Sequence, residues 1–325
     1  MTRAICIHQT GGPEVMRLEP VVVPDPGAGE ARIQHTAVGL NFIDIYHRSG
    51  LYALPRLPGG LGLEAAGVVQ AVGPDVTEVR VGQRVAYAGG PPGAYAEARV
   101  MPAHRLVPLP DAIPDEQGAA MMLKGMTAEY LIRRTFPVQA GQTVLFHAAA
   151  GGVGLIACQW LDALGATVIG TVSSEEKAEL ARTHGCHHPV VYTREDFVAR
   201  VRELTHGQGV PVVYDSVGRT TFAGSLRCLA PRGMLVGFGN ASGKPDPFDM
   251  GILSTSGSLY LTRPTLFDYT AARQDLLHSA AALFDVVQRG VVRIDVRQRW
   301  PLREAAAAHR ALEGRQTTGA SVLVV

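Results

Sequence analysis

The chain has 325 residues, which is long enough for two domains that each bury a sizeable core. Its 30 lysines and arginines nearly balance 29 acidic residues, and neither end carries a run of like charges. This balance disfavours a protein whose main partner is a nucleic acid or an anionic membrane surface.

The sequence also lacks the marks of a secreted or membrane-inserted protein. Its opening segment, MTRAICIHQTGG, reads as a short strand without the apolar core of a signal peptide. No apolar run approaches the length that spans a bilayer. The cysteines stand singly, with no C-x-x-C spacing, at Cys6, Cys158, Cys186 and Cys228. We therefore expect a cytoplasmic protein without disulfides.

From residue 1 to about residue 120, short apolar segments alternate with Gly and Pro. The segments are RAICIH (3–8), ARIQHTAVGL (31–40), GVVQAVG (67–73), QRVAYAG (83–89) and AYAEARV (94–100). Strands at this spacing predict a compact, partly closed β domain. Beyond Pro110, apolar residues recur at helical spacing over residues 115–136, which predicts a helix.

The next segment alternates strands with helices, the pattern of a doubly wound parallel sheet. Predicted strands are Thr143–His147, Thr167–Val172, His188–Tyr192, Val210–Asp215, Met234–Gly237 and Ser258–Thr262, and predicted helices begin near Gly152, Ser174, Asp196 and Thr220. A long helical stretch follows, and the last apolar run predicts a strand that rejoins the N-terminal domain. We place the first domain at residues 1–122, completed by about 267–325, and the second at 123–266.

The first strand, turn and helix of the second domain have the form that binds a dinucleotide. The turn reads HAAAGGVG, with Ala149 at the first position of the usual G-x-G-x-x-G pattern and Gly151 and Gly154 at the other two. A glycine at the second position lets the backbone approach a pyrophosphate, and one at the third lets helix and strand pack closely. The helix start then offers free N–H groups to the phosphates.

The end of the second strand favours NADPH over NADH. NAD-binding folds carry an acid there that binds the ribose hydroxyls, whereas this chain has Thr171-Val172-Ser173. Ser173, Ser174 and Lys177 can instead bind a 2′-phosphate. Two glutamates, residues 175 and 176, oppose this by bringing negative charge nearby. Ser173-x-x-Glu176 has the spacing of a capping box, which accounts for the second of them.

Several segments in this order resemble the medium-chain dehydrogenase/reductase superfamily, specifically its zinc-free quinone oxidoreductase (zeta-crystallin-like) branch. They are GLNFIDIYHRSGLY (39–52), GLGLEAAGVV (60–69), LKGMTA (123–128), HAAAGGVG (147–154), GTVSSEEK (170–177), VVYDSVG (212–218), GFGNASG (237–243) and TRPT (262–265). The resemblance covers essentially the whole chain. It implies a Rossmann domain and a GroES-like, partly closed β-barrel domain.

The resemblance also implies which residues form the site. Asn41, Tyr46 and Tyr52 would surround the nicotinamide and its ribose, and with Lys124 they are the candidate catalytic residues. The implied cofactor contacts are Asn41, Tyr46, Thr127, Ala150, Gly151, Gly152, Val153, Gly154, Gly170, Thr171, Ser173, Ser174, Lys177, Tyr192, Ser216, Val217, Gly237, Phe238, Gly239, Asn240 and Arg315. Lys177 and Tyr192 would serve the 2′-phosphate end.

The zinc ligands of the superfamily's alcohol dehydrogenases are replaced in this chain. Those enzymes carry a Cys in the segment matching GLNFID and a Gly-His-Glu where this chain has Gly62-Leu63-Glu64. Leucine cannot ligate a metal, so we expect no metal site. Without a Lewis acid, hydride donation to a conjugated acceptor such as a quinone is favoured over oxidation of an alcohol. Lys124 is a further candidate for stabilising oxyanion charge on the acceptor.

Two other functions fit the same residues. One is an NADPH-dependent reductase of enone or alkenal carbon–carbon double bonds. The other is a non-catalytic, crystallin-like protein that binds NADPH or RNA, against which the near-neutral charge argues. The resemblance implies a homodimer, formed where two copies of the Ser258–Thr262 strand extend one sheet. Neither the physiological acceptor nor the proton donor follows from the residues.

Overall fold

A computed structural model describes residues 2–325, which form two compact units. The first unit contains the chain up to Met126 together with Thr270–Gln288 and Ile294–Val325, and the second contains Thr127–Tyr269 and Arg289–Arg293. The first boundary falls within helix α2 (Asp115–Tyr130), which continues as a π-helical turn over Leu131–Thr135. This helical stretch corresponds to the one predicted for residues 115–136.

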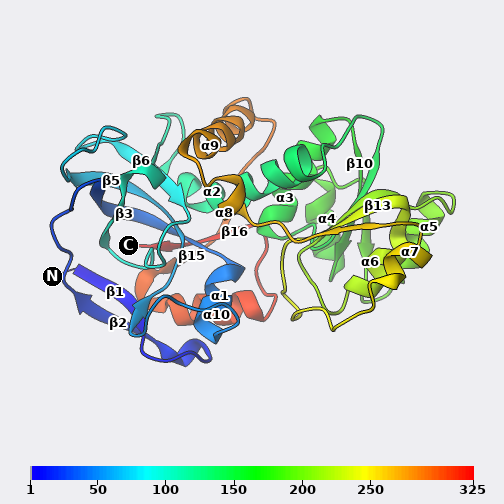
Figure 1. Cartoon of the computed structure of the whole chain (residues 1–325), viewed down its shortest axis with the longest axis horizontal. Helices are drawn as coiled ribbons and strands as arrows, with labels where there is room; N and C mark the ends of the chain where they lie inside the picture. Colours follow the sequence, from blue (N-terminus) through cyan, green and yellow to red (C-terminus); the bar gives the residue numbers. More distant parts are fainter. Residues whose placement is uncertain (1) are drawn as a thin grey trace. The chain divides into compact units, whose positions relative to one another are not determined.

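The second unit is built on a six-stranded parallel sheet in the order β11-β10-β9-β12-β13-β14 (Figure 1). Its strands are β9 (Thr143–Phe146), β10 (Thr167–Val172), β11 (His188–Val191), β12 (Val210–Asp215), β13 (Leu229–Gly237) and β14 (Tyr260–Thr262). Its helices are α3 (Gly152–Ala163), α4 (Glu175–Arg182), α5 (Phe197–Leu204), α6 (Phe222–Cys228), α7 (Gly251–Thr255) and α8 (Leu266–Tyr269). The doubly wound parallel sheet predicted for this segment is confirmed.

The first unit is mostly antiparallel β structure. A seven-stranded sheet has the order β15-β16-β3-β5-β6-β8 with β7 also on β3, and a small sheet has the order β2-β1-β4. The strands are β1 (Thr2–Ile7), β2 (Met16–Val21), β3 (Glu30–Leu40), β4 (Gly59–Gly60), β5 (Glu64–Val72), β6 (Arg84–Ala88), β7 (Ala98–Pro102), β8 (Val107–Pro108), β15 (Val296–Pro301) and β16 (Ala320–Val324). The helices are α1 (Phe42–Ser49), α9 (Arg273–Gln288) and α10 (Ala305–Glu313).

Strand β3 organises the first unit because three other strands pair with it. Its residues 31–38 pair with β5, its residues 30–34 pair with β7, and its residues 37–40 pair with β16. Val322 of β16 lies opposite Gly39, so the last strand of the chain completes the N-terminal sheet. The predicted return of the C-terminal strand to the N-terminal domain is therefore confirmed (Figure 1).

Each unit has its own apolar core, made of the β-branched and leucine residues that gave the strand predictions. In the second unit, Leu145 of β9 lies between Ile169 of β10 and Val213 of β12, and all three are buried. In the first unit, Ile33 and Tyr87 belong to a cluster that also receives Leu323 from the last strand. Each unit is therefore defined by the residues that share its buried core, whatever their order in the sequence.

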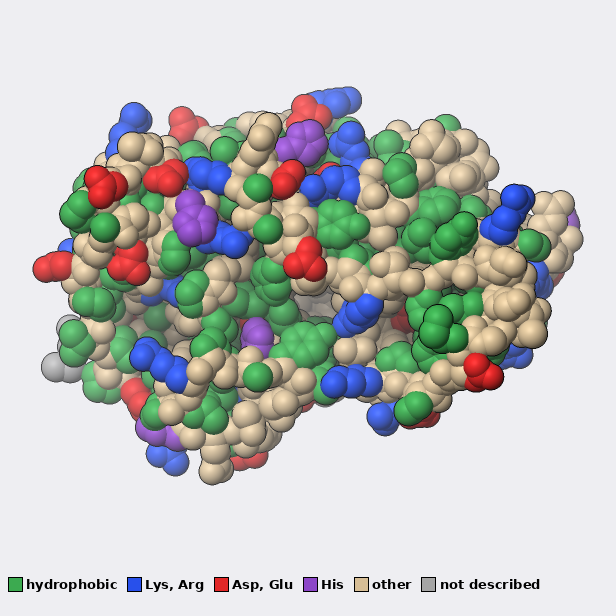
Figure 2. Space-filling model, in the orientation of Figure 1, with side chains coloured by type: hydrophobic (Ala, Val, Ile, Leu, Met, Phe, Trp, Pro, Cys, Tyr) green, Lys and Arg blue, Asp and Glu red, His purple; other side chains and the backbone are tan. Residues whose placement is uncertain are grey.

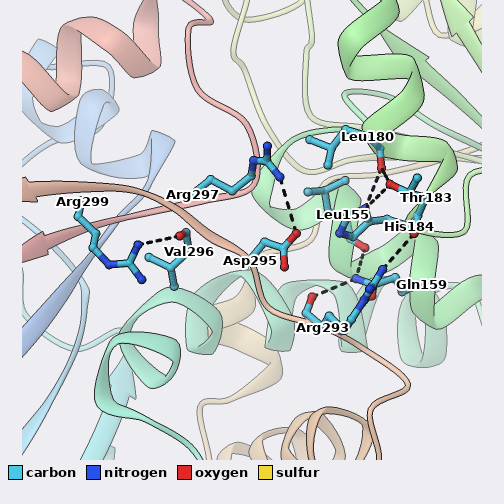
Figure 3. Close-up of polar contacts among 10 residues, drawn as sticks. All are labelled: Leu155, Gln159, Leu180, Thr183, His184, Arg293, Asp295, Val296, Arg297 and Arg299. Atoms are coloured by element: carbon cyan, nitrogen blue, oxygen red, sulfur yellow. Dashed lines mark hydrogen bonds and ion pairs between the residues drawn. The ribbon is translucent and has the colours of Figure 1, made fainter.

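The short segment Arg289–Arg293 joins the second unit through polar contacts with α3 (Figure 3). The side-chain amide of Gln159 accepts from the backbone N–H of Arg293 at 2.9 Å and donates to its carbonyl at 3.1 Å. The Arg293 guanidinium also donates to the carbonyl of Thr183 at 3.2 Å. These bonds satisfy the backbone of a connecting segment between helix α9 and strand β15.

Several local features differ from the sequence predictions. Helix α4 is capped by Ser174, whose hydroxyl accepts from the backbone N–H of Lys177 at 3.3 Å, so the capping box predicted to start at Ser173 is wrong by one residue. Strand β13 begins at Leu229 rather than Met234, because Val210 of β12 pairs with Leu229 before a register shift. Helix α1 and strand β2 were not predicted, and strand β15 separates α9 from α10 in the stretch predicted to be helical throughout.

The surface agrees with the near-neutral composition. On the face drawn in Figure 2, acidic and basic side chains are interspersed over both units. Within residues 2–325, no helix is both long enough and apolar enough to cross a bilayer.

A tight approach of β5 to β3 makes Gly67 a sensitive position. A Cβ on Gly67 would overlap the carbonyl oxygen of Gln34 and lie 2.8 Å from the Cα of His35, both of them backbone atoms that cannot rotate away. We expect Gly67→Ala to destabilise the first unit by about 3 kcal/mol, measured as a lower urea midpoint. Gln70→Ala, on the exposed end of the same strand, should change stability by about 0.5 kcal/mol or less. Equal midpoints for both variants would contradict the packing described.

Candidate functional site

In the second unit, a strained turn joins the end of β9 to the start of α3. Ala148 has φ +56°, a left-handed conformation that is uncommon for a residue with a Cβ, and the N–H of Gly151 bonds back to its carbonyl at 2.9 Å. Gly154 lies directly over this turn, where a Cβ would overlap the Ala148 carbonyl and lie 2.6 Å from that of Ala149. The third glycine of the pattern is thus required by close packing of helix and turn.

The start of α3 fits a bound pyrophosphate. Gly151 is the N-cap residue and brings no side-chain oxygen to the first-turn N–H groups of Gly152 and Val153. Ala150 precedes it and is buried. A helix of twelve residues with an uncapped, side-chain-free start directs N–H groups and a positive dipole end toward an anion. The predicted residues Ala150–Gly154 therefore lie at a helix start that could hold a phosphate.

A buried chain of hydrogen bonds connects this turn to strands β10 and β12. Ser225 donates its single hydroxyl hydrogen to Asp215 at 3.0 Å, so the Nε2–H of His147 must donate to the Ser225 oxygen, also at 3.0 Å. The Nδ1 atom of His147 then accepts from the Thr171 hydroxyl at 2.9 Å. Burial lowers the pKa of His147, although the Asp215 charge opposes the shift. The imidazole is neutral, with its proton on Nε2.

Asp215 connects that chain to the loop that follows β12. Its Oδ1 atom accepts from the backbone N–H groups of Val217 at 2.8 Å and Gly218 at 3.0 Å. The carbonyl of Ser216 accepts from the N–H of Ala241 at 3.1 Å, and a Cβ on Gly239 would overlap that carbonyl. The predicted cofactor segments Ser216–Val217 and Gly237–Asn240 therefore pack on one another, held by a carboxylate at the end of a buried strand.

The residues expected at the 2′-phosphate end also come together. The N–H of Tyr192, just after β11, bonds to the Val172 carbonyl at the end of β10 at 3.1 Å. Parallel pairing of these strands puts Ser173 and Tyr192 at neighbouring strand ends, with Ser174 and Lys177 on the first turn of α4. The Tyr192 side chain is exposed, and no carboxylate ends β10.

In the first unit, a buried carboxylate joins two of the predicted catalytic residues. Glu64, at the start of β5, is fully buried and accepts three hydrogen bonds. Its Oε2 atom accepts from the Asn41 side-chain amide at 2.8 Å and from the Lys124 ammonium at 3.2 Å. Its Oε1 atom accepts from the backbone N–H of Leu123 at 2.7 Å. Glu64 was not among the predicted site residues, although it lies in one of the segments that carry the family resemblance.

A second buried chain runs from α10 to the start of α1. Arg48 donates to Nδ1 of His309 at 3.1 Å, so Nε2–H of His309 donates to the Tyr95 hydroxyl at 3.0 Å. Tyr95 in turn donates to Oδ2 of Asp44 at 2.9 Å, and the N–H of Asn41 donates to the same oxygen at 2.9 Å. Burial and the Arg48 charge lower the pKa of His309 to about 3. These residues were missed, because only the Asn41-x-x-Asp44 spacing of a helix start marks them in sequence.

Asp44 has the most perturbed carboxyl group in this chain of bonds. Burial raises its pKa to about 7, while hydrogen bonds from the Asn41 backbone and from Tyr95 oppose the shift. Its Oδ1 atom is buried without a hydrogen-bond partner among the described residues. A protonated carboxyl can keep both donors on Oδ2, so the neutral form loses no contact.

The other predicted residues occupy a range of environments. Tyr46 and Tyr52 pack edge to face with ring centroids 5.1 Å apart. Thr127 is buried on α2, and Gly170 on β10 has no room for a Cβ because Cys186 packs against it. Phe238 follows β13 and packs on Phe146, and Arg315 follows α10 with φ +57°.

Within residues 2–325, no three His, Cys, Asp or Glu side chains gather in an arrangement that could hold a metal ion. Leu63, at the position where the alcohol dehydrogenases carry a histidine, is buried.

Family models match most of both units. The model of an alcohol dehydrogenase GroES-like domain matches residues 27–111, in agreement with the fold expected for the first unit. The model of a zinc-binding dehydrogenase matches residues 152–280, which begin at the first residue of α3 and include strands β10 to β14 of the parallel sheet.

Curated and solved relatives match along the full chain. A quinone oxidoreductase of Pseudomonas aeruginosa is 54% identical over 324 residues and covers 100% of both chains. A 2-haloacrylate reductase of Burkholderia sp is 48% identical over 333 residues, covering 100% of this chain and 99% of the relative. The crystal structure of Escherichia coli quinone oxidoreductase complexed with NADPH is 47% identical, covers 100% of both chains and has a TM-score of 0.98.

The raised pKa of Asp44 predicts a pH-dependent stability. Between about pH 4 and pH 7 the unfolded chain has lost the Asp44 proton while the folded chain keeps it, so this group's contribution to stability falls as pH rises through that window. Asp44→Asn imitates the protonated form and should be stabilised relative to the parent by up to about 4 kcal/mol above pH 7, with no such gain at pH 4. Urea unfolding at several pH values measures this difference. A gain that is the same at every pH would refute the assignment.

Proposed function

Because this chain belongs to the quinone oxidoreductases of the medium-chain dehydrogenase/reductase superfamily, we propose that it transfers reducing equivalents from NADPH to a quinone without zinc. The observation that carries this proposal is full-length identity of about half to named quinone oxidoreductases, together with a complete dinucleotide turn in the second unit.

The second unit would hold the cofactor. NADPH, when bound, supplies a hydride; the chain supplies binding and orientation. The first-turn N–H groups of α3 would bind the pyrophosphate, and Ser173, Ser174, Lys177 and Tyr192 would bind the 2′-phosphate. Two features support NADPH over NADH: β10 ends without an acid, and Lys177 is one of only three lysines in the chain.

The first unit would serve the acceptor. Tyr46 and Tyr52 present an aromatic pair against which a flat ring can stack. Asn41 donates its amide hydrogen to Glu64, and its carbonyl oxygen, which takes part in the capping box of α1, has a second acceptor site for a ligand. The Lys124 ammonium would stabilise negative charge that develops on the acceptor oxygen.

Zinc independence is part of the proposal, although one matching family model is named for zinc binding. The residues at the zinc-ligand positions support it, because Asn41 and Leu63 stand where alcohol dehydrogenases have a Cys and a His. An amide and an isobutyl group do not replace thiolate and imidazole as zinc ligands.

A second candidate substrate class is an activated carbon–carbon double bond. The 2-haloacrylate reductase is 48% identical over the whole chain, which is within a few per cent of the quinone oxidoreductases. The same conjugated-acceptor requirement covers both classes, so the proposed roles of the residues hold for either.

We also propose that a second copy of the chain is the protein partner, giving a cytoplasmic homodimer. Strand β14 is at the edge of the parallel sheet, and Tyr260 and Leu261 on it are exposed. An exposed edge strand with apolar side chains is suited to pairing with its own copy.

Steady-state rates with benzoquinones, naphthoquinones, alkenals and 2-haloacrylates test the function. With NADPH at one pH and salt concentration, we expect kcat/KM for quinones to exceed that for the alkenes by at least about tenfold. Dialysis against a chelator should leave the quinone rate unchanged, and elemental analysis should find no stoichiometric zinc. A preference for the alkenes would favour the second substrate class, and a rate that depends on added zinc would exclude a metal-free mechanism.

Lys177→Ala tests the cofactor preference. Loss of a charge-assisted hydrogen bond to the 2′-phosphate should lower kcat/KM for NADPH by roughly 10–100-fold while leaving kcat/KM for NADH nearly unchanged. Lys244→Ala removes another lysine of the second unit, an exposed one, and should change neither value. Equal efficiency of the parent enzyme with both cofactors, or no effect of Lys177→Ala, would contradict the assignment.

A further inference from the structure

Glu64 is a buried anion whose three hydrogen-bond donors come from different elements of the first unit. Asn41 precedes α1, whereas Leu123 and Lys124 lie on α2. Two of these donors, the Asn41 amide and the Lys124 ammonium, meet on the single oxygen Oε2. The backbone leaves space for this carboxylate, since a Cβ on Gly39 would overlap it. The arrangement therefore fixes one amide and one ammonium group relative to each other.

Because the Glu64–Lys124 ion pair is buried, its contribution to the stability of the fold does not by itself explain its presence. Glu64 is fully buried and the Lys124 side chain is 7% exposed. Desolvation of two ions often offsets their attraction, and apolar residues of the same volume serve stability as well or better. Asp44 lies close enough that the Lys124 charge lowers its pKa and the Glu64 charge raises it. A charged pair at this position is better explained by a use for the ammonium group.

We propose that Glu64 is a positioning residue, which holds the Lys124 ammonium in a fixed place so that it stabilises negative charge on the acceptor oxygen. This inference rests on the proposed function of the first unit. Lys124 carries three N–H donors, and the Glu64 carboxylate takes one of them. The remaining donors are those that a ligand oxygen can use.

The chemistry balances without any further reagent. A quinone that receives a hydride gains one hydrogen and two electrons, and the pair of electrons displaced from the ring places a negative charge on a carbonyl oxygen. The ammonium stabilises that oxygen by hydrogen bonding and keeps its own protons. Water then supplies one proton, which completes the hydroquinone. A fixed cation needs no reorganisation at the moment of charge development, and for that reason its position matters to the rate.

Glu64→Gln tests the proposal. The amide keeps the shape of the side chain but removes the charge that holds the ammonium, so we expect kcat with a benzoquinone to fall by about 10–100-fold. The Kd of NADPH, measured by fluorescence titration, should stay within about threefold of the parent value. Glu64→Asp restores a carboxylate and should recover part of the lost kcat. Full kcat in Glu64→Gln, or an equal loss in Glu64→Asp, would overturn the proposal.

A double-mutant cycle guards against misfolding. Glu64→Gln leaves a buried ammonium unpaired, whereas Glu64→Gln combined with Lys124→Met removes both charges and should fold well. If Glu64 acts through Lys124, the double variant should be no slower than Lys124→Met alone. Losses that multiply in the double variant would overturn the proposal.

The matched control is another ion pair of the first unit. Asp115 accepts from Arg84 at 2.6 Å at the start of the same helix α2, and Asp115→Asn should leave kcat unchanged. A parent enzyme that reduces no quinone with NADPH would refute the proposed function instead. A parent that reduces quinones, with a fully active Glu64→Gln variant, would refute only the role of Glu64.

Discussion

The parallel pairing of β9 with β10 on one side and β12 on the other is the constraint on which the second unit depends. It brings the carboxyl ends of three strands to one edge of the sheet, where His147, Thr171 and Asp215 then lie within a single hydrogen-bonded chain. Parallel strand pairing therefore brings together residues that are far apart in the sequence. The strained turn at Ala148 and the loop after Asp215 are held in place by that chain rather than by their own sequences.

In both units, buried polar side chains form a chain of hydrogen bonds in which each group has a defined donor or acceptor role. In each, a neutral histidine accepts at one ring nitrogen and donates at the other, and the chain ends on a carboxylate: His147 leads to Asp215, and His309 leads to Asp44. The two ends differ in charge balance. Asp215 accepts from two backbone N–H groups and two hydroxyls, whereas one oxygen of Asp44 has no hydrogen-bond partner within residues 2–325 and its pKa is raised.

The sequence predicted the parts of this protein that depend on local patterns. The alternation of strands and helices, the turn at Gly151 and the return of the last strand all follow from periodicity and from glycine spacing. The capping residue of α4 was misassigned because adjacent serines, Ser173 and Ser174, offer the same cap and only the backbone geometry selects one. Glu64, Tyr95 and His309 could not be assigned from sequence, because their partners lie far away along the chain and no spacing rule links them. The likeness to a known family supplied the candidate residues that periodicity could not.

The position of β16 in the first unit determines which of the two units can first assemble its whole sheet during synthesis. The second unit is complete once residue 293 has left the ribosome, and its sheet requires nothing that follows. The sheet around β3 lacks one of its central partners until Ala320–Val324 are translated, because β16 pairs with residues 37–40. The edge of β3 that pairs with β16 is therefore still without its partner strand when the whole second unit has left the ribosome. The chain closes its first sheet with its last strand.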